Sequence, residues 1–226
     1  MKKIIIAVFV FLIHFFNAQN VFLTKVEKTN ENTDKFLYKI NEEVKDATYL
    51  GEIEVQGFSK YDDEVFSLIY KKAKEIGANT FTLKPFENVD GSLQNFNPAN
   101  YRLSLYFLPK EKLIDQSGYM YLFASSEKDQ KIALNEKDYI ISSRSYLRLK
   151  TIPGEVYTIS TKKLLGSTIK IQLKENSSNN YFQISATKVK SNNTGWLNLK
   201  SGDIIGLEKS YAEFLATIYN KDKQSN

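Results

Sequence analysis

Two hydrophobic patterns divide this 226-residue chain near residue 110, and they constrain its fold more than any other feature. Before that point the pattern predicts one strand, one amphipathic helix and further strands, whereas after it short alternating segments recur between turn residues. We therefore predict an α+β fold. A small β-α-β-β module covers 19–110, a linker covers 111–117, and an antiparallel β-sandwich with a C-terminal helix covers 118–226.

The helix of the first module is the clearest predicted element. It begins near the acids of 62–64 and ends at Gly77, a residue that suits the left-handed conformation after a helix. Its apolar residues have the spacing of one helical face: Val65, Leu68, Ile69, Ala73 and Ile76. A half-buried strand is predicted before it at 49–55, and strands follow it at 80–83 and 101–108.

The second module is predicted from short strands of alternating pattern. The best of them is 168–174, in which apolar and polar side chains alternate along the whole segment. A short strand is predicted over 131–134, after a turn that contains Asp129, and the rest of 125–140 is expected to be loop. A last helix over 207–219 is predicted from apolar residues on one helical face: Leu207, Tyr211, Phe214, Leu215 and Ile218.

The N-terminus has the pattern of a signal peptide. Lys2 and Lys3 precede an apolar run over 4–16, and the polar residues that follow include Ala18, after which we expect cleavage. The run is too short for an ordinary membrane anchor, although a retained anchor is the alternative. No Cys follows it, so no lipid anchor is expected at an N-terminal Cys. The mature protein is thus expected to be exported, either periplasmic or secreted, without a transmembrane segment.

Composition excludes several kinds of chemistry. The chain has no Cys, and its one His, His14, lies in the leader, so a Ser-His-Asp triad, a Cys nucleophile and a thiolate or imidazole metal site are excluded in the mature protein. The net charge is +5, or +3 without the leader lysines, and the lysines are dispersed. We therefore expect no enzyme, no cofactor and no nucleic-acid partner.

Two acidic groups and several serines are weaker candidates. The acids of 62–64 could bind Ca²⁺, but acids in this position more often stabilise a helix start. A second set, Asp129, Glu136 and Asp138, matches no known metal loop. The serines of 125–126 and 142–145 could act as nucleophiles only with a Lys base, and no such placement is evident.

Aromatic residues of the second module are the main candidate binding residues. Several of them on one solvent-facing side of the sandwich would form a stacking surface for a glycan or a peptide, whereas inward-facing rings would belong to the core. The candidates are Tyr119, Tyr121, Tyr146, Tyr157, Tyr181 and Trp196.

Parts of the first module resemble small bacterial domains with a strand of Leu-Gly-acid pattern, a helix and Ala-x-x-x-Gly-Ala-Asn. The matching segments are 49–53 and 73–79, and the group includes the YbjQ-like family and the outer-membrane lipoprotein that senses envelope stress. The resemblance implies a fold rather than an activity, because Gly77, Ala78 and Asn79 would have structural roles. The cysteines of the stress sensor are absent here, so no disulfide-based mechanism carries over.

The second module looks like an uncharacterised β-sandwich domain of bacterial envelope proteins. The resemblance rests on 118–123, 145–149, 152–157 and 180–184, with a Pro-Gly turn and a late Tyr-Phe pair. The leading hypothesis is a non-catalytic envelope or secreted protein that binds another protein or a cell-surface component, including a glycan, through sheet edges or its aromatic face. A small-molecule or Ca²⁺-binding protein is the alternative, and an uncharacterised enzyme is the third.

Overall fold

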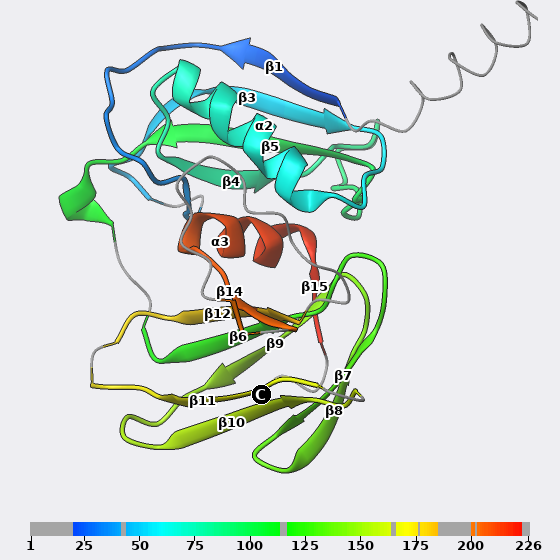
Figure 1. Cartoon of the computed structure of the whole chain (residues 1–226). Coiled ribbons are helices and arrows are strands. Elements are labelled where there is room, and N and C mark those ends of the chain that lie inside the picture. Colours follow the sequence, from blue (N-terminus) through cyan, green and yellow to red (C-terminus); the bar gives the residue numbers. More distant parts are fainter. Residues whose placement is uncertain are drawn as a thin grey trace, which may run out of the picture. The chain divides into compact units, whose positions relative to one another are not determined.

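The computed structural model describes residues 20–41, 44–113, 117–163, 166–175, 177–184, 200–201 and 203–222 (Figure 1). Within these residues the chain is mostly β-sheet with two α-helices, which confirms the α+β class. Its contacts divide the chain into two compact units, 1–109 and 110–226, each described separately below. None of the described helices is long and apolar enough to cross a membrane. The expected signal peptide lies outside the described residues.

The first unit contains a five-stranded sheet and the helix α2. The strands lie in the order β1-β3-β5-β4-β2; all pairs are antiparallel except β2 with β4. The elements are β1 (Asn20–Val26), β2 (Tyr38–Lys39), β3 (Thr48–Gln56), α2 (Asp62–Glu75), β4 (Thr80–Lys84) and β5 (Asn100–Phe107).

Alternation along the strands gives this sheet one apolar face, and α2 lies across the sheet in Figure 1. Ile53, Leu103 and Phe81 of three adjacent strands are fully buried, as are Ile69 and Ala73 of the helix. The opposite alternation sends polar side chains to the other face. The predicted helix is confirmed, including its end, because Gly77 has a φ of +79° directly after the helical turn.

The second unit contains two sheets and the helix α3. One sheet has the order β11-β10-β7-β8, and the other has the order β13-β14-β12-β6-β9-β15. The first sheet comprises β7 (Gln130–Leu134), β8 (Lys137–Ile141), β10 (Val156–Thr161) and β11 (Thr168–Gln172). The second comprises β6 (Tyr119–Phe123), β9 (Ser145–Lys150), β12 (Asn180–Ile184), β13 (Lys200–Ser201), β14 (Ile204–Gly206) and β15 (Asn220–Lys221). A short 3₁₀ helix, η1 (Lys110–Lys112), precedes them.

A buried core draws side chains from both sheets of this unit. Met120 and Leu122 of β6 belong to the same cluster as Ile132 of β7 and Ile159 of β10. The predicted last helix is α3 (Lys209–Ile218), which Figure 1 places over the six-stranded sheet. The Glu208 carboxylate caps it by accepting hydrogen bonds from the backbone N–H groups of its first turn.

Two expectations about the second unit are wrong. The six-stranded sheet is mixed rather than antiparallel, because β12 pairs in parallel with β6 and β15 pairs in parallel with β9. The predicted strand 131–134 is present as β7, but the residues after its turn are not loop, because they form β8, which pairs with β7 in a hairpin. The turn residues of this hairpin, Asn135 and Glu136, both have positive φ, and Glu is an unusual residue for such a turn, which hid the second strand in the sequence.

Candidate functional site

The face of the six-stranded sheet that points away from the four-stranded sheet, on the side of α3, gathers tyrosines from three neighbouring strands. In the pairing register Tyr121 lies opposite both Arg148 and Tyr181, Phe123 lies opposite Tyr146, and Tyr119 lies opposite Lys150. We call the following set the aromatic face: Tyr119, Tyr121, Tyr146, Arg148, Lys150 and Tyr181.

Strand alternation explains why these residues share a face. Met120 and Leu122 of β6 and Leu147 of β9 point into the core between the sheets, so the residues between them point the other way. The rings of Tyr121 and Tyr181 have centroids 5.0 Å apart, and those of Tyr121 and Tyr146 are 5.8 Å apart. These separations are typical of favourable aromatic pairs.

The burial of two of these rings contradicts the expectation of a solvent-facing stacking surface. Tyr121 is 8% exposed and Tyr181 is 7% exposed, so neither ring offers a free surface. Neighbouring rings account for part of this covering, and Tyr219, at the end of α3, packs edge-on against Phe123 with centroids 6.3 Å apart. Tyr119 and Tyr146 remain half-buried, while Lys150 is exposed. Access to the aromatic face is therefore restricted to its β6–β9 side.

The other two aromatic candidates do not join this face. Tyr157 lies on β10 of the other sheet and belongs to the sandwich core. Its hydroxyl accepts a hydrogen bond from the Ile152 N–H at 2.9 Å and donates one to Glu155 at 3.1 Å. Its role is thus structural. Trp196 lies outside the described residues.

Two cationic side chains, Arg148 and Lys150, lie at the accessible side of the aromatic face. The Arg148 guanidinium lies 3.9 Å from the ring centroid of Tyr119, a cation–π contact. Burial raises the pKa of Tyr121 and of Tyr146, although the charge of Arg148 acts in the opposite direction on both. Both hydroxyls therefore stay protonated near neutral pH and can donate hydrogen bonds.

The structure does not bring the candidate acids together. Asp138 pairs with Lys162 at 2.7 Å, and Asp129 accepts a hydrogen bond from the Ser143 N–H at 2.8 Å. Asp62 to Glu64 form the first turn of α2, as the helix-start interpretation expects. Across the described ranges, no three His, Cys, Asp or Glu side chains form a group that could hold a metal ion.

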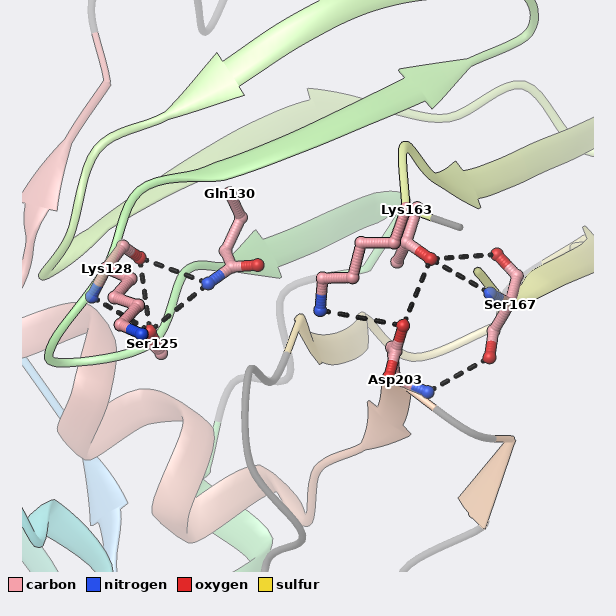
Figure 2. A network of polar contacts seen from close by, with 7 residues as sticks. Ser125, Lys128, Gln130, Lys163, Ser167 and Asp203 are labelled. Carbon is pink, nitrogen blue, oxygen red and sulfur yellow. Dashed lines mark hydrogen bonds and ion pairs between the residues drawn. The ribbon is translucent and has the colours of Figure 1, made fainter. Parts of the chain in front are cut away.

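Among the serine candidates, the hydroxyl of Ser125 serves loop structure. Figure 2 shows that the Ser125 hydroxyl is engaged by Lys128 and Gln130. It accepts from the Lys128 backbone N–H and donates to the Lys128 carbonyl oxygen, both at 3.1 Å. In a second group Asp203 accepts from Lys163, and its N–H donates to the Ser167 hydroxyl at 3.0 Å. These bonds connect loops and leave no evident base for either hydroxyl.

A buried carboxylate in the first unit was missed by the sequence analysis. Glu52 lies on the polar face of the sheet, 8% exposed, and accepts hydrogen bonds from Lys84 and from Tyr49, the latter at 2.6 Å. Burial alone would raise the pKa of Glu52, but these bonds and the charge of Arg102 outweigh it and hold the pKa below its usual value. Lys84 and Arg102 lie on other strands than Glu52, and Tyr49 lies on the other side of an irregularity in β3. No local sequence motif therefore reveals these partners of Glu52.

Lys74 is a second unusual charged group of the first unit. Its ammonium donates to the carbonyl oxygens of Phe36 at 2.6 Å and Ala78 at 2.9 Å, and it lies over the ring of Tyr70. Burial lowers the pKa of Lys74 to about 8, while the charge of Asp34 opposes this shift. The segment that contains Phe36 is thereby tied to the end of α2.

We expect an NMR titration of ¹³C-labelled lysine to show one resonance with a midpoint near pH 8, absent in Lys74→Met. Between pH 8 and 10.5 the folded state binds fewer protons at Lys74 than the unfolded state, so stability should rise with pH there. Below pH 8 both states are protonated and the contribution is constant. A Lys74 midpoint above pH 10 would contradict the buried position.

The motif of the first-module resemblance has a structural explanation in this chain. A Cβ on Gly51 would lie 2.1 Å from the Lys25 carbonyl oxygen, and Asn79, fully buried, bonds both the N–H and the carbonyl oxygen of Leu108. The motif residues therefore serve the fold, while membership of that family stays a prediction. Comparisons with protein-family models, with curated proteins and with solved structures find no match to this chain.

Proposed function

We propose that this is an exported, non-catalytic protein of the envelope or the secreted fraction that binds another protein or a cell-surface component. The observation that carries the proposal is the accessible side of the aromatic face, where two neighbouring strands present the half-buried Tyr119 and Tyr146 beside Arg148. Tyr and Arg are the residue types most enriched in the binding centres of interfaces. Export rests on the leader pattern of residues 1–18.

The residues present favour binding over catalysis. The mature sequence offers neither imidazole nor thiol, and the Ser125 hydroxyl bonds backbone groups of Lys128. Glu52 is held ionised by its cationic neighbours, so it is an acceptor and not a proton donor near neutral pH. A rigid sheet that presents rings, hydroxyl donors and a guanidinium supports recognition by surface complementarity.

The proposal also keeps the domain plan inferred from sequence. A signal peptide over 1–18 precedes a small α+β module over 19–110, a linker over 111–117 and a β-sandwich module with its helix over 118–226. In this plan the first module stabilises the mature protein, and the second carries the binding face. The likeness of each module to bacterial envelope domains belongs to the same proposal.

Retention on isolated cell envelopes of the native host tests the function. We expect the double variant Tyr146→Ala/Arg148→Ala to bind at least about tenfold more weakly than wild type, because loss of one interface hot spot costs roughly 2 kcal/mol. Tyr61→Ala is the matched control, since Tyr61 is a 53% exposed ring of the first unit. Equal retention of all three proteins would refute the proposal. A Tm that rises with Ca²⁺ without envelope retention would favour the ion-binding alternative.

A further inference from the structure

Strand β1 forms one edge of the five-stranded sheet of the first unit. It pairs with β3 on one side, and within the part of the chain that the structure describes no strand pairs with its other side (Figure 1). Its seven residues make it the longest of the described edge strands, since β8 and β11 have five residues each and β2, β13 and β15 have two. An open edge of this length is a template for pairing with a further strand.

The backbone of β1 has hydrogen-bonding groups that face outward. The Leu50 carbonyl oxygen of β3 accepts a hydrogen bond from the residue that follows β1, so alternation along β3 directs the backbone groups of Glu54 to β1 as well. Phe22 lies opposite Glu54 and therefore bonds to β3. The N–H and carbonyl groups of Val21 and Leu23 consequently point to the open edge, where an antiparallel strand can bond them.

The side chains of β1 leave apolar surface uncovered at the same edge. Phe22 is 45% exposed, and its place opposite Glu54 puts it on the polar face of the sheet. On the apolar face Val21 is buried, but Leu23 is only half-buried. Apolar side chains are thus accessible on both faces of the sheet, directly beside the outward backbone groups.

The residues of this edge are compatible with a second copy of themselves. Residues 20–24 carry no charge, so two copies that pair here bring no like charges together. With the copies antiparallel about a two-fold axis at Phe22, the two Phe22 rings meet on one face, and Val21 of each copy lies opposite Leu23 of the other. Because Val21 and Leu23 have the outward backbone groups, this register also makes both pairs hydrogen-bonded.

Charges make the other edges less suitable for a copy. The strands β8 and β11 carry Asp138 and Lys170 within their five residues, and like charges on directly opposite residues destabilise an antiparallel pair. In β1 the first charge is Lys25, which pairs with Glu27 at 2.8 Å and follows an irregularity of the register after Leu23. The regular part of the β1 edge is therefore its uncharged part.

We infer that the partner of the β1 edge is a second copy of this chain. The copies pair antiparallel through 20–24, and their two five-stranded sheets join into one continuous sheet. The interface is the same on both copies and small, so the dimer is weak and its population depends on protein concentration. This inference goes beyond the proposed function and does not depend on it, because β1 belongs to the first unit and the aromatic face to the second.

Sedimentation equilibrium of the purified mature chain tests the self-association. Between about 10 μM and about 1 mM, where weak complexes dissociate, we expect a monomer–dimer equilibrium. Phe22→Lys should weaken dimerisation at least about tenfold, because the aromatic pair is lost and two lysines lie opposite each other. Val89→Lys is the matched control, since Val89 is a fully exposed apolar residue in a loop of the same unit. This control should dimerise like wild type.

A single introduced cysteine tests the register. The chain contains no Cys, so Phe22→Cys provides its only thiol. In the inferred register the two Cα atoms at position 22 form a non-hydrogen-bonded pair about 4.5 Å apart, a separation that a disulfide can span. Mild oxidation should give a disulfide-linked dimer from Phe22→Cys and little from Val89→Cys, although both positions are exposed.

Three results would overturn the inference. They are a wild-type chain that stays monomeric over the whole concentration range, dimerisation that Phe22→Lys leaves unchanged, and equal disulfide yields from Phe22→Cys and Val89→Cys. Circular dichroism should show that the Phe22 variants fold, since the side chain is exposed. If Phe22→Lys does not fold, the wild-type equilibrium and the disulfide yields decide.

Discussion

Replacing Gly77 with alanine is expected to destabilise the first unit by at least about 3 kcal/mol. A Cβ at this position would lie 1.7 Å from the carbonyl oxygen of Asn30, which is backbone and cannot rotate away. The positive φ of +79° adds a cost of roughly 1–2 kcal/mol for any residue with a Cβ. Relief of the clash would move Asn30 and break its N–H bond to the Ile76 carbonyl oxygen, now 3.1 Å long.

Gly91→Ala provides the matched control for Gly77→Ala. Gly91 also has a positive φ, +81°, but no atom lies within 4 Å of its added Cβ, so only the backbone cost of about 1 kcal/mol remains. Thermal unfolding should show a Tm loss of about 5 °C for Gly91→Ala and more than about 12 °C for Gly77→Ala, since 1 kcal/mol corresponds to roughly 4–8 °C in a unit of this size. Similar losses of Tm in the two variants would show that a Cβ at position 77 does not clash with the Asn30 carbonyl oxygen.

Asn79→Ala is expected to lower the free energy of unfolding of the first unit by about 3 kcal/mol. The Asn79 amide is fully buried, accepts from the Leu108 N–H at 2.9 Å and donates to the Leu108 carbonyl oxygen at 2.8 Å and to Asp34 at 2.9 Å. Alanine would leave both buried groups of Leu108 without these partners, and each such group costs roughly 1–3 kcal/mol. The change thus loosens the end of β5 and the segment around Asp34 together.

The control for Asn79→Ala is Asn32→Ala. Asn32 also donates to a backbone carbonyl, that of Gly77 at 3.0 Å, but it is only half-buried, so water can replace the lost bond. Urea unfolding followed by hydrogen exchange at the Leu108 amide should show a large loss of protection in Asn79→Ala and a small one in Asn32→Ala. Full protection of the Leu108 amide in Asn79→Ala would contradict the role assigned to this side chain.

The sequence predicts elements whose determinants are local. The helix over 62–77 follows from apolar spacing, charge placement and Gly77, and the structure confirms it as α2 with its apolar side buried. The last helix is recovered for the same reason. By contrast, β8 was missed although β7 was predicted, because Asn135-Glu136 lacks the Gly that usually marks a hairpin turn.

Properties that depend on distant pairing could not be predicted. The parallel neighbours of β6 and β9 come from segments about 60 and 75 residues later in the chain, and nothing local selects parallel over antiparallel pairing. For the candidate site, residue type identified four of the tyrosines that meet on one face. It could not show that Tyr121 and Tyr181 are covered, that Tyr157 belongs to the opposite sheet, or that Arg148 lies over Tyr119.

Site-specific photo-cross-linking in the native host tests the binding role of the aromatic face most directly. A photoreactive phenylalanine would replace Tyr146 on this face in one protein, and Thr158, on the outward side of the four-stranded sheet, in another. The account predicts a reproducible cross-linked adduct from position 146 and none from position 158. Adducts of equal yield from both positions, or from position 158 alone, would contradict it.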